Sequence, residues 1–227
     1  MLSRPSEAAS ISAAGGSLAG QLLDALRSDV ITGRYPPGYR LVERDVAETY
    51  GVSRLPAREA LQALRAEGFL EVKKTRGLVV RSWSERDVAE LFDIRQALEA
   101  VACRQAAANR TDADIRALRQ AVTAADDAVA AGNAPAAHNA NALFHQLLVT
   151  ASHNVTLGEI MAPVLFRVQW LVRQIPDPHA VSHDHHEITD AIAGRDGPLA
   201  ERLAIEHAEH NRTTTLVAIF GPSGHGH

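Results

Sequence analysis

Residues 38–64 read GYRLVERDVAETYGVSRLPAREALQAL, and the pattern of these residues predicts the fold of the first part of the chain. It holds two short helical patterns, residues 43–50 and 54–67, separated by Gly51. A glycine suits the left-handed position that ends a helix, and Ser53 is a residue type that caps the next one. Two short helices joined by a tight glycine turn are typical of a helix-turn-helix.

Further elements on both sides of this stretch complete a winged helix. Before it, apolar residues recur every four positions behind a capping serine and predict a first helix: Ser17, Leu18, Leu22, Leu26 and Val30. After it, residues 69–72 and 78–81 read as strands, and the basic segment 73–77 joins them. We therefore expect residues 17–83 to form a winged helix-turn-helix with a small β-hairpin wing.

The charge of the chain differs between its two parts. Residues 1–83 hold 12 Lys and Arg against 9 Asp and Glu, whereas residues 84–227 hold 11 against 18 together with all eleven histidines. A basic first part suits a polyanion such as nucleic acid. The single cysteine, Cys103, rules out an internal disulfide and a multi-cysteine metal site, so we expect a cytoplasmic protein. The longest run without formal charge, residues 128–158, is too polar for a membrane span.

The helix predicted at residues 54–67 has a face that suits DNA. Arg54 and Arg58 lie opposite its apolar face, and Pro56 falls in its first turn, where a missing N–H costs little. Arginine at the start of a recognition helix can bond both acceptors of guanine in the major groove, while serine binds phosphate. Exposed arginines often contact only water, but here the glycine turn, both arginines and the basic hairpin together favour DNA binding.

Residues 18–81 resemble the DNA-binding domain of GntR-family transcription regulators, on the quoted stretch and on Glu67-Gly68 and Arg76-Gly77 after it. The resemblance implies that these residues contact or approach DNA: Arg44, Ser53, Arg54, Arg58 and, in the wing, Gly77. Leu55 departs from the family, which usually has threonine at this position. Its apolar side chain could pack on the methyl group of a thymine, so Leu55 is a candidate DNA-contacting residue as well.

Residues 84–220 predict helices throughout, without an alternating strand pattern. Ser84 with Asp87 and Thr111 with Asp114 match the capping box that starts a helix. The expected helices are a long one from Ser84, one at 111–132, one from Pro135 to about Ser152, one at 154–175 with a bend at Pro163, and two at 180–193 and 198–220. We expect an all-α helical-bundle effector domain at 84–220, between a disordered tail at 1–16 and a mobile tail at 221–227.

Three histidines occupy positions from which they could form an interior site. Asn141 and His145 lie four residues apart on one face of a helix, His185 lies near the start of the next-to-last helix, and His207 lies in the last. Three imidazoles and one oxygen suit Zn²⁺ or a neighbouring ion such as Ni²⁺ or Mn²⁺. A buried histidine more often satisfies only its own hydrogen bonds, so the spacing by itself leaves both alternatives open.

Residues 85–215 resemble the FCD effector domain of the FadR-like branch of the same family, on motifs that include Arg95-x-x-x-Glu99, Asn141-x-x-Phe144-His145 and Asp184-His185. Many members bind a metal through one aspartate and three histidines and hold a small carboxylate against it. The resemblance therefore implies a divalent metal, with Zn²⁺ first, on His145, His185 and His207. Asn141 replaces the aspartate, which makes the site one charge more positive and favours an anionic effector.

Arg95 lies on the inward side of its expected helix, where an unpaired cation is costly. It could bind the carboxylate of an effector. It could instead pair with Glu99 one turn later, which on an exposed helix contributes only a few tenths of a kcal/mol, and both alternatives stay open. Arg167 and Trp170 are weaker candidates for an effector pocket, and Trp170 equally suits the core.

The sequence favours a ligand-responsive transcription regulator over an enzyme. It contains no H-E-x-x-H motif, no paired Glu-x-x-His helices and no nucleophile elbow, and a metal enzyme would not explain the winged helix. A metal sensor without an organic effector is a further alternative. We expect a homodimer that binds a palindromic double-stranded operator, a repressor as most relatives are, with no membrane partner.

Overall fold

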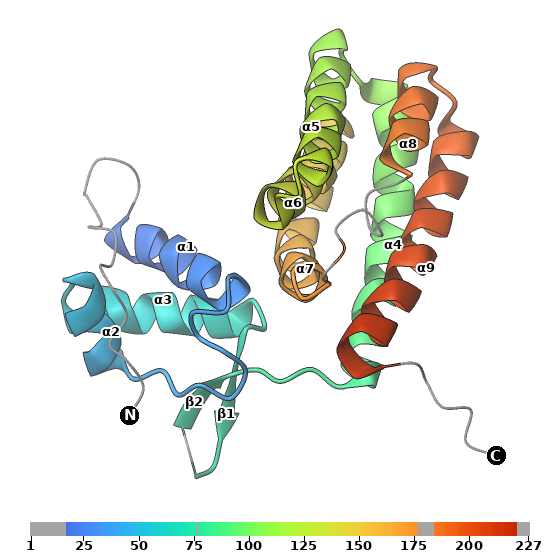
Figure 1. The fold of residues 1–227 in the computed structure, drawn as a ribbon. Helices are drawn as coiled ribbons and strands as arrows, with labels where there is room; N and C mark the ends of the chain where they lie inside the picture. Colours follow the sequence, from blue (N-terminus) through green and yellow to red (C-terminus); the bar gives the residue numbers. More distant parts are fainter. Residues whose placement is uncertain (1–16, 76, 176, 178–183, 222–227) are drawn as a thin grey trace. The chain divides into compact units, whose positions relative to one another are not determined.

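The structure, a computed structural model, describes residues 17–75, 77–175, 177 and 184–221. The chain divides after Ser82 into two compact units (Figure 1). Helices make up most of the described residues, and a two-stranded antiparallel sheet lies in the first unit. The mainly α-helical fold class is thereby confirmed. The expected tails, residues 1–16 and all but the first of residues 221–227, lie outside the described residues.

The first unit is a set of short helices followed by a hairpin, as the sequence predicts. Its elements are α1 (Leu18–Ile31), α2 (Glu43–Tyr50), α3 (Arg54–Ala66), β1 (Leu70–Lys73) and β2 (Gly77–Val80). Gly51 between α2 and α3 has a φ of 66°, the left-handed conformation expected of this turn. The strands pair from Leu70 opposite Val80 to Lys73 opposite Gly77, so the predicted strand bounds are wrong by one residue.

Ser53 precedes α3 in an extended conformation, but its side chain makes no capping hydrogen bond, contrary to our expectation. A capping side chain accepts from the backbone N–H of the second or third helical residue, and Pro56, the third residue of α3, has no N–H. Only the N–H of Leu55 remains for such a bond, and the Ser53 hydroxyl does not accept from it.

The core of the first unit forms where the apolar faces of the helices meet the hairpin. Four of its large side chains have no exposed surface: Leu22, Leu26, Leu64 and Phe69. Arg27 of α1 also reaches the far end of α3, where its Nε and Nη2 donate to Glu67 at 2.7 and 2.6 Å. These contacts hold α3 by its buried face and its C-terminal end, so its first turn and outer face remain open.

The second unit is a helical bundle in which α4 and α9 pack along each other (Figure 1). Its helices are α4 (Glu85–Asn109), α5 (Asp112–Ala130), α6 (Ala134–Ala151), α7 (Val155–Val172), α8 (His185–Ala193) and α9 (Gly197–Phe220). Helix α6 packs on α4, α5 and α7, and α8 packs on α4, α5 and α9. Helix α8 begins at His185, and its expected start near residue 180 lies outside the described residues.

Helix α7 runs through Pro163 and ends at Val172, three residues before the predicted end. By length and composition it is apolar enough to cross a membrane, a property that core helices of soluble proteins share. Its buried side chains belong to a helix that packs on α4 and α6: Leu157, Met161, Val164, Val168 and Leu171. We interpret α7 as a core helix of the bundle.

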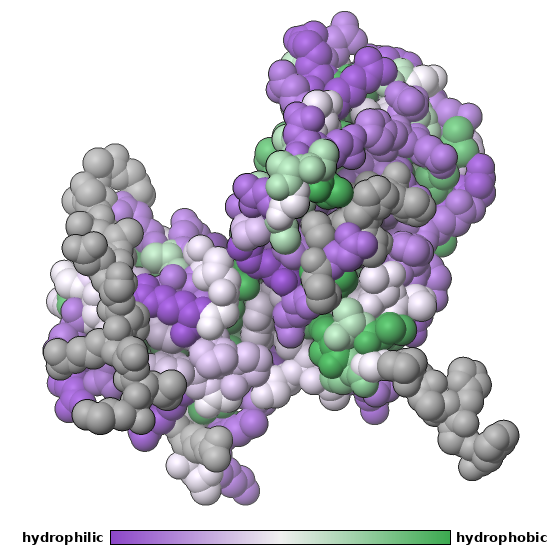
Figure 2. All heavy atoms as spheres, viewed as in Figure 1, coloured by the Kyte–Doolittle hydropathy of each residue, from purple (hydrophilic) through white to green (hydrophobic). Residues whose placement is uncertain are grey.

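The surface of the second unit is largely hydrophilic in the view of Figure 2. Apolar side chains gather on it near the C-terminal end of α9, where Val217 is 47% exposed and Phe220 is 36% exposed. The neighbouring Leu216 and Ile219 are half-buried and pack on the core between α4 and α7. The last turns of α9 therefore carry apolar side chains on more than one face.

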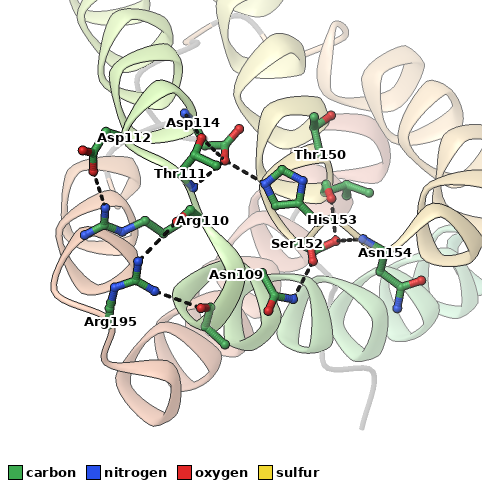
Figure 3. Close-up of polar contacts among 12 residues, drawn as sticks. Asn109, Arg110, Thr111, Asp112, Asp114, Thr150, Ser152, His153, Asn154 and Arg195 are labelled. Carbon is green, nitrogen blue, oxygen red and sulfur yellow. Dashed lines mark hydrogen bonds and ion pairs between the residues drawn. The ribbon is translucent and has the colours of Figure 1, made fainter.

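Polar contacts tie together the loops that follow α4, α6 and α8 (Figure 3). Both predicted capping boxes are present, and in the second one Thr111 and Asp114 each bond the backbone N–H of the other. The Nε2 atom of His153 lies 2.9 Å from the same Asp114 carboxylate. Arg195 donates to the carbonyl of Ala108 at 2.9 Å. Local caps thus set where the helices begin, and contacts between the loops hold the connections between helices together.

Candidate functional site

Three arginines of the first unit line an open cleft of about 620 Å³. The lining residues come from the start of α2, the start of α3 and the hairpin: Arg40, Leu41, Val42, Glu43, Arg44, Asp45, Arg54, Gly77 and Leu78. The side chain of Arg44 is 72% exposed and contacts Asp45 at 3.2 Å. Arg44, Arg54 and Gly77, which we expected to contact DNA, therefore share one surface.

The outer face of α3 presents Arg54, Leu55 and Arg58, all of them exposed. Arg58 already has a partner, because its Nε and Nη2 donate to Glu43 of α2 at 2.9 and 3.3 Å. The hydrogen bond from Arg58 lowers the pKa of the Glu43 carboxyl, so the pair is charged at neutral pH. The bonds to Glu43 use the Nε side of the guanidinium, so Nη1 and the second N–H of Nη2 stay available to a base.

Gly77 opens β2 with a φ of 71°, and in the described part of the chain no atom other than those of its chain neighbours lies within 4 Å of the place that a Cβ would take. The need for glycine is therefore conformational, since an L side chain is strained at this φ. The missing side chain also leaves the backbone of the hairpin open to close approach by another molecule.

The structure brings His145 of α6, His185 of α8 and His207 of α9 together inside the second unit, with one ligand nitrogen from each lying within 4.8 Å of the others. All three side chains are buried. The ring centroids of His185 and His207 are 4.8 Å apart, and Phe144 stacks on His185 at 3.9 Å. Three helices that are separate in sequence thus supply one nitrogen-rich cluster.

Hydrogen bonding decides which nitrogen of His145 carries the proton. Its Nδ1 lies 2.9 Å from Oε1 of Glu99, and its Nε2 lies 2.9 Å from Nη2 of Arg95. Because a guanidinium only donates, Nε2 must accept, and the proton of the neutral imidazole sits on Nδ1, facing the carboxylate. The lone pair of His145 that could bind a metal therefore faces Arg95.

The other histidines use their nitrogens differently. The Nδ2 atom of Asn211 lies 2.9 Å from Nε2 of His207, and Oδ2 of Asp184 lies 3.4 Å from its Nδ1. Among the described residues, neither ring nitrogen of His185 has a hydrogen-bond partner, although both are buried. The same holds for Oδ1 of Asn141, one turn before His145 on α6. Buried acceptors in this condition need a ligand, a metal or water.

Burial keeps the three imidazoles neutral. It lowers the pKa of His145, lowers that of His185 well below its usual value, and brings the pKa of His207 to about 4. The pKa of Glu99 is also lowered: burial opposes this change, but the charge of Arg95 and the neighbouring His145 side chain outweigh burial. At neutral pH the cluster therefore holds three neutral nitrogen donors beside a charged Arg95–Glu99 pair.

This donor set fits a divalent metal of the zinc type. Neutral imidazole is the form that ligates a metal, and a set rich in nitrogen suits Zn²⁺ and its neighbours in the first transition row. Oε1 of Glu99 lies 2.9 Å from Nδ1 of His145, and a carboxylate beside the second ring nitrogen is the arrangement that orients a metal-bound histidine. For ligation through Nε2, the Arg95 donor has to leave His145 and the Asn211 donor has to leave His207.

Arg95 is completely buried, as its place in the sequence predicts. Its Nε lies 3.1 Å from Oε1 of Glu99, and both side chains are at most 2% exposed. The few tenths of a kcal/mol expected for an exposed pair therefore do not apply, because breaking a buried pair leaves an unpaired charge in the core. The Nη1 atom of Arg95 is buried without a hydrogen-bond partner in the described part of the chain.

The other two effector candidates make contacts elsewhere. Trp170 is buried and packs edge-on against Trp83, with 5.6 Å between ring centroids. Arg167 is half-buried and donates from Nε to the carbonyl of Pro163, within its own helix, at 3.0 Å. Neither of these contacts involves the three histidines.

Comparison with known proteins assigns both units. The model of the bacterial regulatory proteins of the gntR family matches residues 18–80, and that of the FCD domain matches residues 90–210. Over 194 residues, 84% of this chain and 85% of the relative, the chain is 30% identical to a protein of Paenarthrobacter nicotinovorans named as the probable D-xylose utilization operon transcriptional repressor.

Solved structures show the same likeness. A GntR transcriptional regulator from Rhodococcus sp. RHA1 has a TM-score of 0.74 at 25% identity, with 87% of this chain and 97% of that chain covered. McbR/YncC of E. coli has a TM-score of 0.76 at 25% identity, with 87% and 96% covered.

The chain belongs to the GntR family. Because that family and its relatives are transcription regulators, this GntR protein is a DNA-binding transcription regulator with an FCD domain, and it is not an enzyme. The arginine cleft lies in the part that matches the gntR model. The three histidines lie in the part that matches the FCD domain.

Several side chains of this GntR regulator touch the candidate residues but were given no role from the sequence: Arg40, Glu43, Asp184 and Asn211. Asn211 follows His207 by one helical turn, so its spacing could have drawn attention to it. Glu43 and Arg58 lie 15 residues apart on different helices, and no local pattern links them. Glu99 was considered only as a partner of Arg95, although it also contacts His145.

Proposed function

We propose that this regulator is a cytoplasmic repressor whose FCD domain binds a small carboxylate effector beside a divalent metal. The observation that carries the proposal is the meeting of three neutral histidines with the buried guanidinium of Arg95, whose Nη2 lies 2.9 Å from His145. The nitrogen donors suit Zn²⁺, with Ni²⁺ and Mn²⁺ as alternatives. The relative from P. nicotinovorans is named as a repressor, which supports the sign of regulation.

Arg95 couples the metal to the effector in this proposal. While Nη2 donates to His145, the lone pair on Nε2 is occupied. Once the guanidinium has left His145, its Nη1 and Nη2 can both donate to a carboxylate, which is the geometry that arginine favours. Metal and effector should therefore strengthen each other's binding.

Asn141 is the proposed oxygen ligand. Its Oδ1 is buried without a hydrogen-bond partner among the described residues, one turn before His145. An amide oxygen ligates without adding negative charge, so Asn141→Asp should bind Zn²⁺ more tightly and an anionic effector more weakly. Equal zinc affinity in the wild-type protein and this variant would argue against Asn141 as a ligand.

The metal site is tested by mass spectrometry of untagged protein purified without nickel resin. We expect close to one equivalent of metal in the wild-type protein and in a variant that lacks residues 221–227, which carry two histidines of their own. The His145→Ala/His185→Ala variant should contain none. His186→Ala is the matched control, since His186 is the exposed neighbour of His185 and pairs with Asp126. Metal retained by the double variant would refute the site.

A metal sensor without organic effector is the second candidate. It is favoured by the charge of Glu99, which already neutralises Arg95 and leaves no net charge on the pair to attract an anion. Addition of Zn²⁺ to chelated protein, followed by a DNA-binding assay, separates the two functions. A metal sensor responds to the ion alone, whereas a carboxylate sensor responds only after a metal-chelating carboxylate is added.

The DNA-binding unit is proposed to act as part of a homodimer on a palindromic double-stranded operator. The exposed apolar side chains at the end of α9 support self-association of the second unit. The proposed DNA contacts surround the cleft and the first turn of α3: Arg44, Ser53, Arg54, Leu55, Arg58 and Gly77. Arg40 joins them because it lines the same cleft.

Alanine substitution tests the DNA contacts. Arg54→Ala/Arg58→Ala should abolish specific binding while the oligomeric state and metal content stay unchanged, because both side chains are exposed. Arg65→Ala is the control, since Arg65 is an exposed arginine in the last turn of the same helix. Specific operator binding by the double variant would refute the assignment of this face.

A further inference from the structure

Leu55 is an exposed apolar side chain that shares the outer face of α3 with two arginines. It is 62% exposed in the first turn of α3, and Arg54 and Arg58 share the outer face of the helix with it. The buried face of α3 is formed by other residues: Ala57, Ala60, Leu61 and Leu64. Leu55 therefore contributes little to the core of its own unit, and its role depends on what α3 contacts.

The first turn of α3 belongs to the face that we propose for DNA contact, and this inference rests on that proposal. Base edges in the major groove present hydrogen-bond donors and acceptors, and the apolar group among them is the 5-methyl group of thymine. A leucine side chain cannot bond a donor or an acceptor, and it costs free energy where it covers one. Beside a methyl group it removes apolar surface from water on both partners.

We propose that Leu55 makes this regulator select a pyrimidine 5-methyl group at one base of each operator half-site. The arginines on either side bond hydrogen-bonding base edges or phosphates, and Leu55 adds a contact that only a methylated base can satisfy. Thymine carries this group in unmodified DNA, and 5-methylcytosine presents the same group at the same position of the groove.

The test begins with duplexes that the full-length wild-type protein selects from a randomised library. Each thymine of the selected half-site is then replaced by uracil, which lacks only the methyl group. At one position per half-site we expect uracil to weaken binding of the wild-type protein about fourfold, as the loss of one buried methyl contact does. The Leu55→Ser variant should bind the thymine and uracil duplexes equally.

Two further variants control this comparison. Leu55→Met keeps an apolar side chain of similar length and should retain the preference for thymine. Val72→Ser removes a side chain of β1 that is 61% exposed, and it should leave the preference unchanged. All the substituted positions are exposed, so the thermal unfolding of each variant should match that of the wild-type protein within a few degrees.

The possible results differ in what they contradict. Wild-type protein that binds every uracil duplex as tightly as the thymine duplex would overturn the inference. So would a uracil effect of the same size in Leu55→Ser, since the methyl group would then act through DNA shape or another residue. Failure to select any duplex contradicts the proposed DNA contacts themselves. Cytosine compared with 5-methylcytosine at the same position shows whether the methyl group is recognised on either pyrimidine.

Discussion

Two arginine–glutamate pairs lie on α4 with the same spacing of four residues, and they differ in burial. Arg95 and Glu99 are at most 2% exposed, whereas Arg86 is 87% and Glu90 is 61% exposed. Removing one partner of a buried pair leaves the other charge buried and unpaired. Glu99→Gln should therefore lower the free energy of unfolding of metal-free protein by about 3–5 kcal/mol, because Arg95 stays charged in the core.

The exposed pair supplies the control for this prediction. Glu90→Gln changes the same residue type on the same helix and should alter the free energy of unfolding by less than about 1 kcal/mol. Urea denaturation of both variants in the presence of a chelator measures the difference. Equal losses of unfolding free energy in the two variants would show that the buried pair contributes no more to stability than the exposed pair.

The buried histidines make stability depend on pH. The pKa of His207 is about 4 in the folded protein because of burial, although Asp184 opposes the shift, and in an unfolded chain it is about 6.5. Between these values the unfolded chain binds more protons. The contribution of His207 to the free energy of unfolding is therefore fully present above about pH 6.5. It falls by about 1.4 kcal/mol per pH unit as the pH is lowered toward 4.

Substitution isolates the contribution of His207. Urea titrations of metal-free wild-type protein and His207→Gln between pH 4 and 7 should give different slopes of the free energy of unfolding against pH, with the shallower slope in the variant. His210→Gln removes an exposed histidine from the same helix and serves as the comparison for the loss of a histidine from α9. Parallel curves for wild type and His207→Gln would contradict the lowered pKa.

The start of α5 depends on a cap that the sequence predicts correctly. Thr111 accepts from the backbone N–H of Asp114 at 3.2 Å, and the Asp114 carboxylate accepts from the backbone N–H of Thr111 at 2.7 Å (Figure 3). Thr111→Ala should therefore lower the free energy of unfolding by about 1 kcal/mol. Thr150→Ala is the control, because Thr150 only donates back to the carbonyl of Gln146 within α6. An equal change in both variants would mean that the cap adds nothing.

The first turn of α3 shows where this local reasoning fails. Ser53 is the right residue type for a cap and stands at the right position, but Pro56 removes one of the two backbone donors that a cap can use. The sequence shows the loss of that donor. Only the structure shows that the remaining donor, the N–H of Leu55, is not bonded by the Ser53 hydroxyl either.

Metal should stabilise the molecule through the second unit. A ligand that binds only the folded state adds about 2.7 kcal/mol at one hundred times its dissociation constant. Zn²⁺ added to chelated wild-type protein should therefore raise the temperature of unfolding, and the rise should grow with ion concentration. His145→Ala/His185→Ala should show no rise, and His186→Ala should behave as wild type. A zinc-dependent rise in the double variant would place the ion elsewhere.

The helix-turn-helix, the hairpin, the helical bundle and the apolar faces of the helices could be predicted from the sequence. The reason is that these features depend on neighbours within one or two turns: a glycine at the end of α2, capping boxes at Ser84 and Thr111, and apolar residues repeating at helical spacing. Periodicity also predicted that Arg95 points inward, which the structure confirms.

Which inward-facing groups meet depends on how the helices pack and could not be predicted from the sequence. Arg95 and His145 are 50 residues apart, Glu43 and Arg58 are 15 apart on different helices, and the three clustered histidines come from α6, α8 and α9. A helical pattern specifies a face but not the depth or rotation at which that face packs on another. The partners of His145, and with them the tautomer that leaves its lone pair facing Arg95, were therefore set by packing across the bundle.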